Sequence, residues 1–109
     1  MIKGIEALTC ECLLAADAAG VTDEVLKSLG GDWATRANYN LERMLVHGAR
    51  RAAEMEEVCH TLEALGVEPA LTRGTVRRQS EFGMIGKGAA PNDLDEKLAL
   101  VRQHTRMPA

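Results

Sequence analysis

The sequence is poor in aromatic side chains, which make up only 3% of its 109 residues. Without many rings, the core must be built from Leu, Val, Ala, Ile and Met, a set that favours helices over a β-sandwich. The aromatic residues, which also leave little surface for nucleobases to stack on, are Trp33, Tyr39 and Phe82. Because 13 Lys and Arg stand against 16 Asp and Glu, the net charge is −3. We therefore expect no nucleic-acid partner.

Membrane and export signals are missing as well. No apolar run approaches the ~20 residues that a membrane span needs. Residues 1–6 lack the basic and then apolar pattern of a signal peptide, because Glu6 stands where the apolar region would begin. Three cysteines are an odd number for a disulfide framework. Together these absences predict a cytoplasmic protein with free thiols and no membrane partner.

Apolar residues recur at helical spacing along most of the chain, and we find no βαβ unit and no glycine-rich phosphate loop. The pattern predicts an all-α fold, a compact bundle of about five to six helices, in a single domain of residues 1–109. The expected helices cover residues 2–19, 22–29, 33–46, 49–65, 72–82 and a last segment that starts at Asn92 or Asp93 and frays toward Met107, Pro108 and Ala109.

Glycines mark the expected interruptions. Gly20 and Gly66 are C-cap candidates. His47 with Gly48 is a weak point, where the third helix breaks or bends. Three further glycines, Gly83, Gly86 and Gly88, predict a flexible loop before the last helix.

Three apolar stripes predict which side chains are buried. On the first helix the stripe is Ile5, Leu8, Cys12, Ala15 or Ala16, and Ala19; on the third it is Ala37, Leu41, Met44 and Leu45; on the fourth it is Met55, Val58, Cys59, Leu62 and Leu65. The first helix carries apolar side chains on more than one face, namely Ile2, Ile5, Leu8, Leu13 and Leu14. A small domain cannot cover all of them, so we expect a homodimer.

Cysteine and histidine side chains suggest metal or nucleophile chemistry, but their spacing is unfavourable. On a helix, Cys10 and Cys12 point about 200° apart, and Cys59 and His60 about 100° apart. We expect core cysteines, a surface histidine and no metal site. Cys59 lies on an apolar stripe, where a thiol is unreactive.

The cluster Arg50, Arg51 and Glu54 is the candidate substrate-binding site. Glu54 follows the arginines at helical spacing and can pair with either. The guanidinium groups can alternatively hold a substrate carboxylate or phosphate in a two-pronged grip. A structural salt-bridge network and contact with a small anionic substrate both remain open. The sequence does not bring a general base, a general acid and a cofactor-binding loop together, so we identify no catalytic residue.

Two stretches resemble a known family. Residues 4–21 read GIEALTCECLLAADAAGV, which is similar to the long helix that opens the C-terminal domain of β-hydroxyacid dehydrogenases. Residues 51–58 read RAAEMEEV, followed by GVEP at 66–69, which is similar to a later helix of that domain. Over residues 1–86 the chain resembles the helical C-terminal domain of phosphogluconate-dehydrogenase-like, NAD(P)-binding oxidoreductases; residues 87–109 add a loop and a terminal helix.

The resemblance implies a fold like the C-terminal domain of 6-phosphogluconate dehydrogenase. It also implies that NAD or NADP binds to an N-terminal Rossmann domain, in cis or in trans, that is absent from this chain. The family's catalytic lysine would precede Met1, and Lys3 lies in the wrong register to replace it. The wider family often has a Lys-Asp pair on the later helix, where this chain has Ala53 and Glu54.

We therefore expect the substrate-side and dimerisation domain of an NAD(P)-dependent oxidoreductase that acts on a hydroxy acid or a phosphogluconate-like compound. Alone, the chain would hold no cofactor and be inactive. The alternative is a free-standing helical homodimer that serves as an interaction or scaffold module without enzymatic activity.

Overall fold

The computed structural model describes residues 1–105 and consists of five helices. In chain order these are α1 (Ile2–Ala19), α2 (Thr22–Leu29), α3 (Trp33–Ala64), α4 (Ala70–Gly86) and α5 (Leu94–Thr105). No strand occurs in the described part of the chain. The predicted all-α fold is confirmed; the expected fraying at Met107, Pro108 and Ala109 lies outside the described residues.

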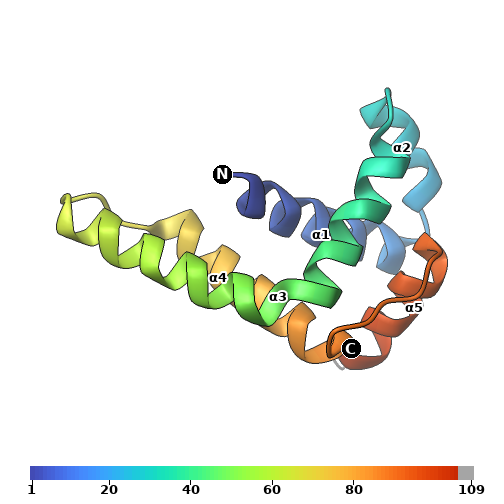
Figure 1. The fold of residues 1–109 in the computed structure, drawn as a ribbon. Coiled ribbons are helices and arrows are strands. Elements are labelled where there is room, and N and C mark those ends of the chain that lie inside the picture. Colours follow the sequence, from blue (N-terminus) through green and yellow to red (C-terminus); the bar gives the residue numbers. More distant parts are fainter. Residues whose placement is uncertain (106–109) are drawn as a thin grey trace.

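The helices form two regions that share α3 (Figure 1). The first half of α3 packs with α1, α2 and α5, and its second half forms a long antiparallel hairpin with α4. Gly20 ends α1 as predicted: with φ of 72° it adopts the left-handed conformation, and its N–H donates to the carbonyl oxygens of Ala16 and Asp17.

The third and fourth expected helices are one continuous helix of 32 residues. The weak point at His47 and Gly48 therefore does not break α3, but the helix changes direction in its middle, green part (Figure 1). This bend lets one helix contact both regions of the molecule.

The loop before the last helix begins later than expected, at Lys87, because α4 stays helical through Gly83 and as far as Gly86. Gly83 and Gly86 serve close packing with α3 instead. A Cβ atom on Gly48 would lie 2.2 Å from the Gln79 carbonyl oxygen, and one on Gly86 would lie 2.1 Å from that of Leu45. The backbones of α3 and α4 touch where only hydrogen atoms fit between them.

The core lies between α1, α3, α4 and α5, with Phe82 fully buried among aliphatic residues. The stripe predicted on the first part of α3 is confirmed, since all of its members are buried: Ala37, Leu41, Met44 and Leu45. Of the later stripe, Met55 and Cys59 are buried, whereas Val58 and Leu65 are exposed.

The stripe predicted on α1 is wrong except for Ala16, which is buried. Its members Ile5, Leu8 and Cys12 are exposed, and the buried face consists of Glu6, Ala7, Cys10, Leu13 and Ala16. Relative to this expectation the helix is rotated, and Glu6 meets a cationic partner on α3, described below. An apolar strip of α1 therefore remains on the surface.

A buried lysine attaches α5 to α3. Lys97 Nζ donates to the Asn38 side-chain oxygen at 2.6 Å and to the Asn92 carbonyl at 2.8 Å. Its charge lies 3.9 Å from Glu42. Within residues 1–105, none of the helices is both long enough and apolar enough to cross a membrane.

Candidate functional site

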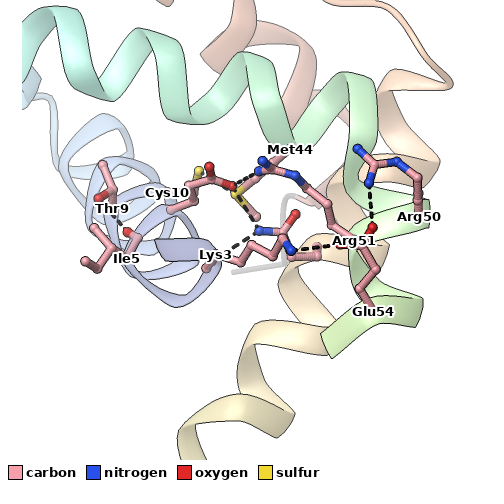
Figure 2. A network of polar contacts seen from close by, with 10 residues as sticks. Lys3, Ile5, Thr9, Cys10, Met44, Arg50, Arg51 and Glu54 are labelled. Atoms are coloured by element: carbon pink, nitrogen blue, oxygen red, sulfur yellow. Dashed lines mark hydrogen bonds and ion pairs between the residues drawn. The ribbon is translucent and has the colours of Figure 1, made fainter. Parts of the chain in front are cut away.

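The three predicted site residues lie on consecutive turns of α3, just after its bend, and two of them, Arg51 and Glu54, contact the start of α1. Figure 2 shows Arg51 reaching from α3 toward α1, whereas Arg50 stays on the outer side of α3 beside Glu54. Lys3, from the first turn of α1, completes the group. The structure thus brings all three together, but gives the two arginines different surroundings.

Glu54 holds the outer part of the cluster together. Its carboxylate accepts a hydrogen bond from Lys3 Nζ at 2.7 Å and one from Arg50 Nη1 at 2.5 Å. The bond from Lys3 is the main cause that lowers the pKa of Glu54; partial burial opposes this, and the bond from Arg50 adds to it. Glu54 is therefore ionised near neutral pH, and Arg50 keeps an exposed guanidinium beside it.

Arg51 is a core residue. It is only 8% exposed and donates to Glu6, which is 3% exposed. Gln79 of α4 donates to the same Glu6 oxygen at 3.2 Å and to the Lys3 carbonyl at 3.1 Å. Arg51 thus ties three helices together through a buried ion pair, which is the structural role that the sequence had left open.

Sequence reasoning missed Glu6 and Gln79. The signal available was that Glu6 shares a helical face with Cys10 and Leu13, at spacings of four and seven. The competing stripe through Ile5 and Leu8 is more apolar, so it was the natural choice for burial.

Further cations continue along the same side of α3 toward its start. The Arg43 guanidinium lies 5.9 Å from the centroid of the Tyr39 ring. Partial burial lowers the pKa of His47, and the charges of Arg43, Arg50 and Arg51 lower it further. This part of α3 is therefore electropositive.

The cysteines give no sign of catalysis. Cys10 is buried with its Sγ 3.1 Å from Met44 Sδ, and burial raises the pKa of its thiol. Cys59 is buried, while Cys12 and His60 are exposed. Among residues 1–105, no three His, Cys, Asp or Glu side chains converge as metal ligands.

A groove of about 700 Å³ runs between the first half of α1 and α4. Its apolar lining includes Ile5, Leu8 and Leu71, of which Leu8 is 69% and Leu71 89% exposed. Residues of both charge signs border it, namely Glu11, Arg77, Arg78 and Glu81. This is the surface left open by the rotation of α1.

Comparison with known proteins gives a family and a solved structure. No curated protein matches the chain. The crystal structure of a conserved hypothetical protein from Sinorhizobium meliloti 1021 is similar, with a TM-score of 0.83 and 35% sequence identity over 95% of this chain. This chain spans only 38% of the length of that protein. The model of a domain of unknown function, DUF1932, matches residues 16–82, and the chain therefore belongs to the DUF1932 family.

Proposed function

We propose that this chain is the substrate-side and dimerisation domain of an NAD(P)-dependent oxidoreductase that acts on a hydroxy acid or a phosphogluconate-like substrate. The resemblance of residues 1–86 to the helical C-terminal domain of such enzymes supports the proposal. The similar protein from Sinorhizobium meliloti is much longer than this chain, which leaves room for a nucleotide-binding domain beside the helical one.

The arrangement of Arg50 supports the substrate role most directly. Glu54, which is also paired with Lys3, holds one edge of the Arg50 guanidinium, while the group itself stays exposed. A guanidinium in this setting is oriented in advance to take a carboxylate or phosphate. Of the three predicted site residues, Arg50 would make the direct contact, Glu54 would orient it, and Arg51 would support both from the core.

The cofactor would bind elsewhere. A dinucleotide needs a strand, a glycine-rich turn and a helix N-terminus, and residues 1–105 contain no strand. NAD or NADP supplies the hydride chemistry when it is bound to a Rossmann domain, in cis or in trans. The residues of this chain would bind and orient the substrate's acid group.

Arg50→Lys in the enzyme complete with its nucleotide-binding domain tests the substrate role. Lysine keeps the charge but loses the fork, so we expect a raised KM for 2- and 3-hydroxy acids or sugar-acid phosphates, at little cost to folding. Arg73→Lys, on an exposed position of α4 outside the groove, is the matched control. An unchanged KM in Arg50→Lys would refute substrate contact by this residue.

The exposed strip of α1 supports the dimerisation role. Ile5 and Leu8 line the groove beside Leu71, and a second copy would bury these apolar side chains. Its border carries both charge signs, which suits a two-fold contact in which the same surfaces meet. The proposed occupant of the groove is therefore a second copy of this chain.

Light scattering tests this role. We expect a mass of about twice 11.8 kDa, and Leu8→Glu should return a monomer because it places a charge in the contact. Leu29→Glu, on an exposed position at the end of α2, is the control and should stay dimeric. A monomeric wild type at high micromolar concentration would exclude the groove as a self-association surface.

The alternative proposal is a homodimeric scaffold without enzymatic activity, favoured by the burial of Arg51 in a structural ion pair. The coding sequence upstream of Met1 separates the two. An in-frame lysine-bearing helix preceded by a Gly-x-Gly-x-x-Gly strand-turn-helix supports the oxidoreductase. A stop codon with a ribosome-binding signal supports the scaffold.

A further inference from the structure

One face of α3 carries a row of basic side chains, of which the proposed substrate site uses only Arg50. Arg36, Arg43, His47 and Arg50 follow one another at spacings of seven, four and three residues, so they share one side of the helix. Glu42 is the one carboxylate in this stretch of α3, and it lies toward Lys97 instead.

The cations on this face differ in how they are neutralised. Arg50 has Glu54 as its partner. In the part of the chain that the structure describes, neither Arg36 nor Arg43 has a carboxylate oxygen within 4.0 Å. Arg36 lies over the Trp33 ring, with its guanidinium carbon 4.8 Å from the ring centroid.

Arg43 has the least satisfied side chain of the row. Its Nε atom is buried and has no hydrogen-bond partner among the described residues. Tyr39 covers one face of its guanidinium from 5.9 Å, which holds the group in place but accepts no hydrogen bond. A buried donor of this kind costs free energy unless an acceptor reaches it.

His47 lies one helical turn after Arg43, about 6 Å along the axis. The charged groups around it are Arg43, Arg50 and Arg51 from α3 and Glu6 from α1. Because burial and the three guanidinium groups lower the pKa of His47, its imidazole is neutral near pH 7 and can donate one hydrogen bond. A bound anion would attract positive charge, so it would raise the pKa of His47 and favour the protonated imidazole.

We propose that Arg43 and His47 form an anion-binding site on α3, which takes a phosphate or carboxylate group of a small ligand. The Arg43 fork supplies two donors and the imidazole a third. The inference rests on the proposed function in one respect, since it makes this group a second acid group of the substrate, held one to two helical turns before the group that Arg50 contacts.

Nuclear magnetic resonance of the 109-residue chain tests the site. The His47 ring protons are followed while inorganic phosphate, and in a second series acetate, replaces chloride at constant ionic strength. We expect a saturable shift of the His47 signals and a raised His47 pKa with at least one of the two anions. The more effective anion identifies phosphate or carboxylate as the ligand group. A response to neither anion would overturn the proposal.

Variants separate a specific grip from general charge screening. Arg43→Gln should weaken anion binding by about tenfold or more, which is the loss expected for a charged hydrogen-bond pair. Arg43→Lys is the second variant, in case Arg43→Gln fails to fold. It keeps the positive charge and should still bind the anion more weakly than the wild type, because lysine lacks the two-pronged guanidinium. Arg73→Gln, at an exposed position of α4 outside the groove, is the control and should bind like the wild type. Equal binding by wild type and both Arg43 variants would exclude Arg43 as a ligand.

The outcome is separable from that of the proposed function, because anion binding is measured without cofactor or turnover. Anion binding at His47 in the 109-residue chain, together with no dehydrogenase activity of the protein complete with its nucleotide-binding domain, would uphold the site and reject the oxidoreductase. Dehydrogenase activity that depends on Arg50 but not on Arg43 would do the reverse.

Discussion

Glu6 and Arg51 form a buried ion pair between α1 and α3. Both are nearly fully buried, and Gln79 adds a hydrogen bond to the same carboxylate. Removing one partner of such a pair leaves an uncompensated charge in the core. The pair therefore matters more through the cost of breaking it than through its own net attraction.

Glu6→Gln should consequently destabilise the protein by about 3–5 kcal/mol, because it strands the buried Arg51 guanidinium. The matched control is Glu54→Gln, which removes a partly exposed carboxylate from Lys3 and Arg50 and should cost far less. Urea unfolding followed by circular dichroism measures both. Equal losses for the two variants would contradict the structural role of the buried pair.

His47 gives a prediction about pH. Its pKa in the folded protein lies below the value of about 6.5 in the unfolded chain, so the unfolded chain binds more protons between these values. The contribution of His47 to stability is therefore fully present above pH about 6.5 and is lost as the pH falls through the folded pKa.

We expect His47→Gln to flatten the fall in Tm between pH 7 and pH 5, measured in chloride buffers that contain no phosphate. The exposed His60, farther along α3, provides the control. The His60→Gln variant should keep the wild-type pH profile. A wild-type profile in His47→Gln as well would show that other groups cause the pH dependence.

At the scale of single residues, the sequence predicted ion pairs within one helix and missed ion pairs between residues far apart in the chain. The Arg50–Glu54 pair follows from a spacing of four on one helix. The Arg51–Glu6 pair joins residues 45 positions apart, and no periodicity within one helix contains that information. Charge alone also could not show which of two neighbouring arginines turns inward.

For the helices, the expected boundaries were largely right because periodicity and glycine caps act locally. Gly20 ends α1 as expected. Gly48, Gly83 and Gly86 were interpreted by the same rule as weak points or loops, yet they are contact residues between α3 and α4. A glycine indicates either a flexible backbone or a close approach, and the sequence does not distinguish these two uses.

Gly48→Ala tests the close approach directly. A Cβ atom there would lie 2.2 Å from the Gln79 carbonyl oxygen, so the helices must separate, at a cost of about 1–3 kcal/mol or more. Gly74→Ala is the control, because it also lies inside a helix but has no neighbouring atom within 4 Å. Alanine should stabilise that position by up to about 1 kcal/mol. Thermal unfolding should thus move the two variants in opposite directions, and a stabilised Gly48→Ala would contradict the tight crossing.

At the scale of the whole molecule, composition predicted the all-α class but not which surface stays open. A core that relies on aliphatic residues and one buried phenylalanine suits helices. The exposure of Ile5 and Leu8 depends instead on the rotation of α1, which turns Glu6 toward Arg51 in the core. The burial of a charged residue on α1 thus goes together with an exposed apolar strip on the same helix.

In the proposed enzyme the cofactor binds to a separate domain and this chain binds the substrate, which leads to a prediction for the chain as a whole. The phosphates of a dinucleotide are held by backbone N–H groups of a glycine-rich turn between a strand and a helix. Residues 1–105 form helices joined by short turns and contain no strand. The anion site proposed at Arg43 and His47 offers side chains for one acid group, not a cradle for two linked phosphates and two ribose rings. Calorimetric titration of the 109-residue chain should therefore give no micromolar binding of NAD or NADP, while inorganic phosphate or acetate still shifts the His47 signals. Tight binding of either dinucleotide would mean that the helical domain holds the cofactor itself, and the proposed separation of cofactor and substrate sides would have to be abandoned.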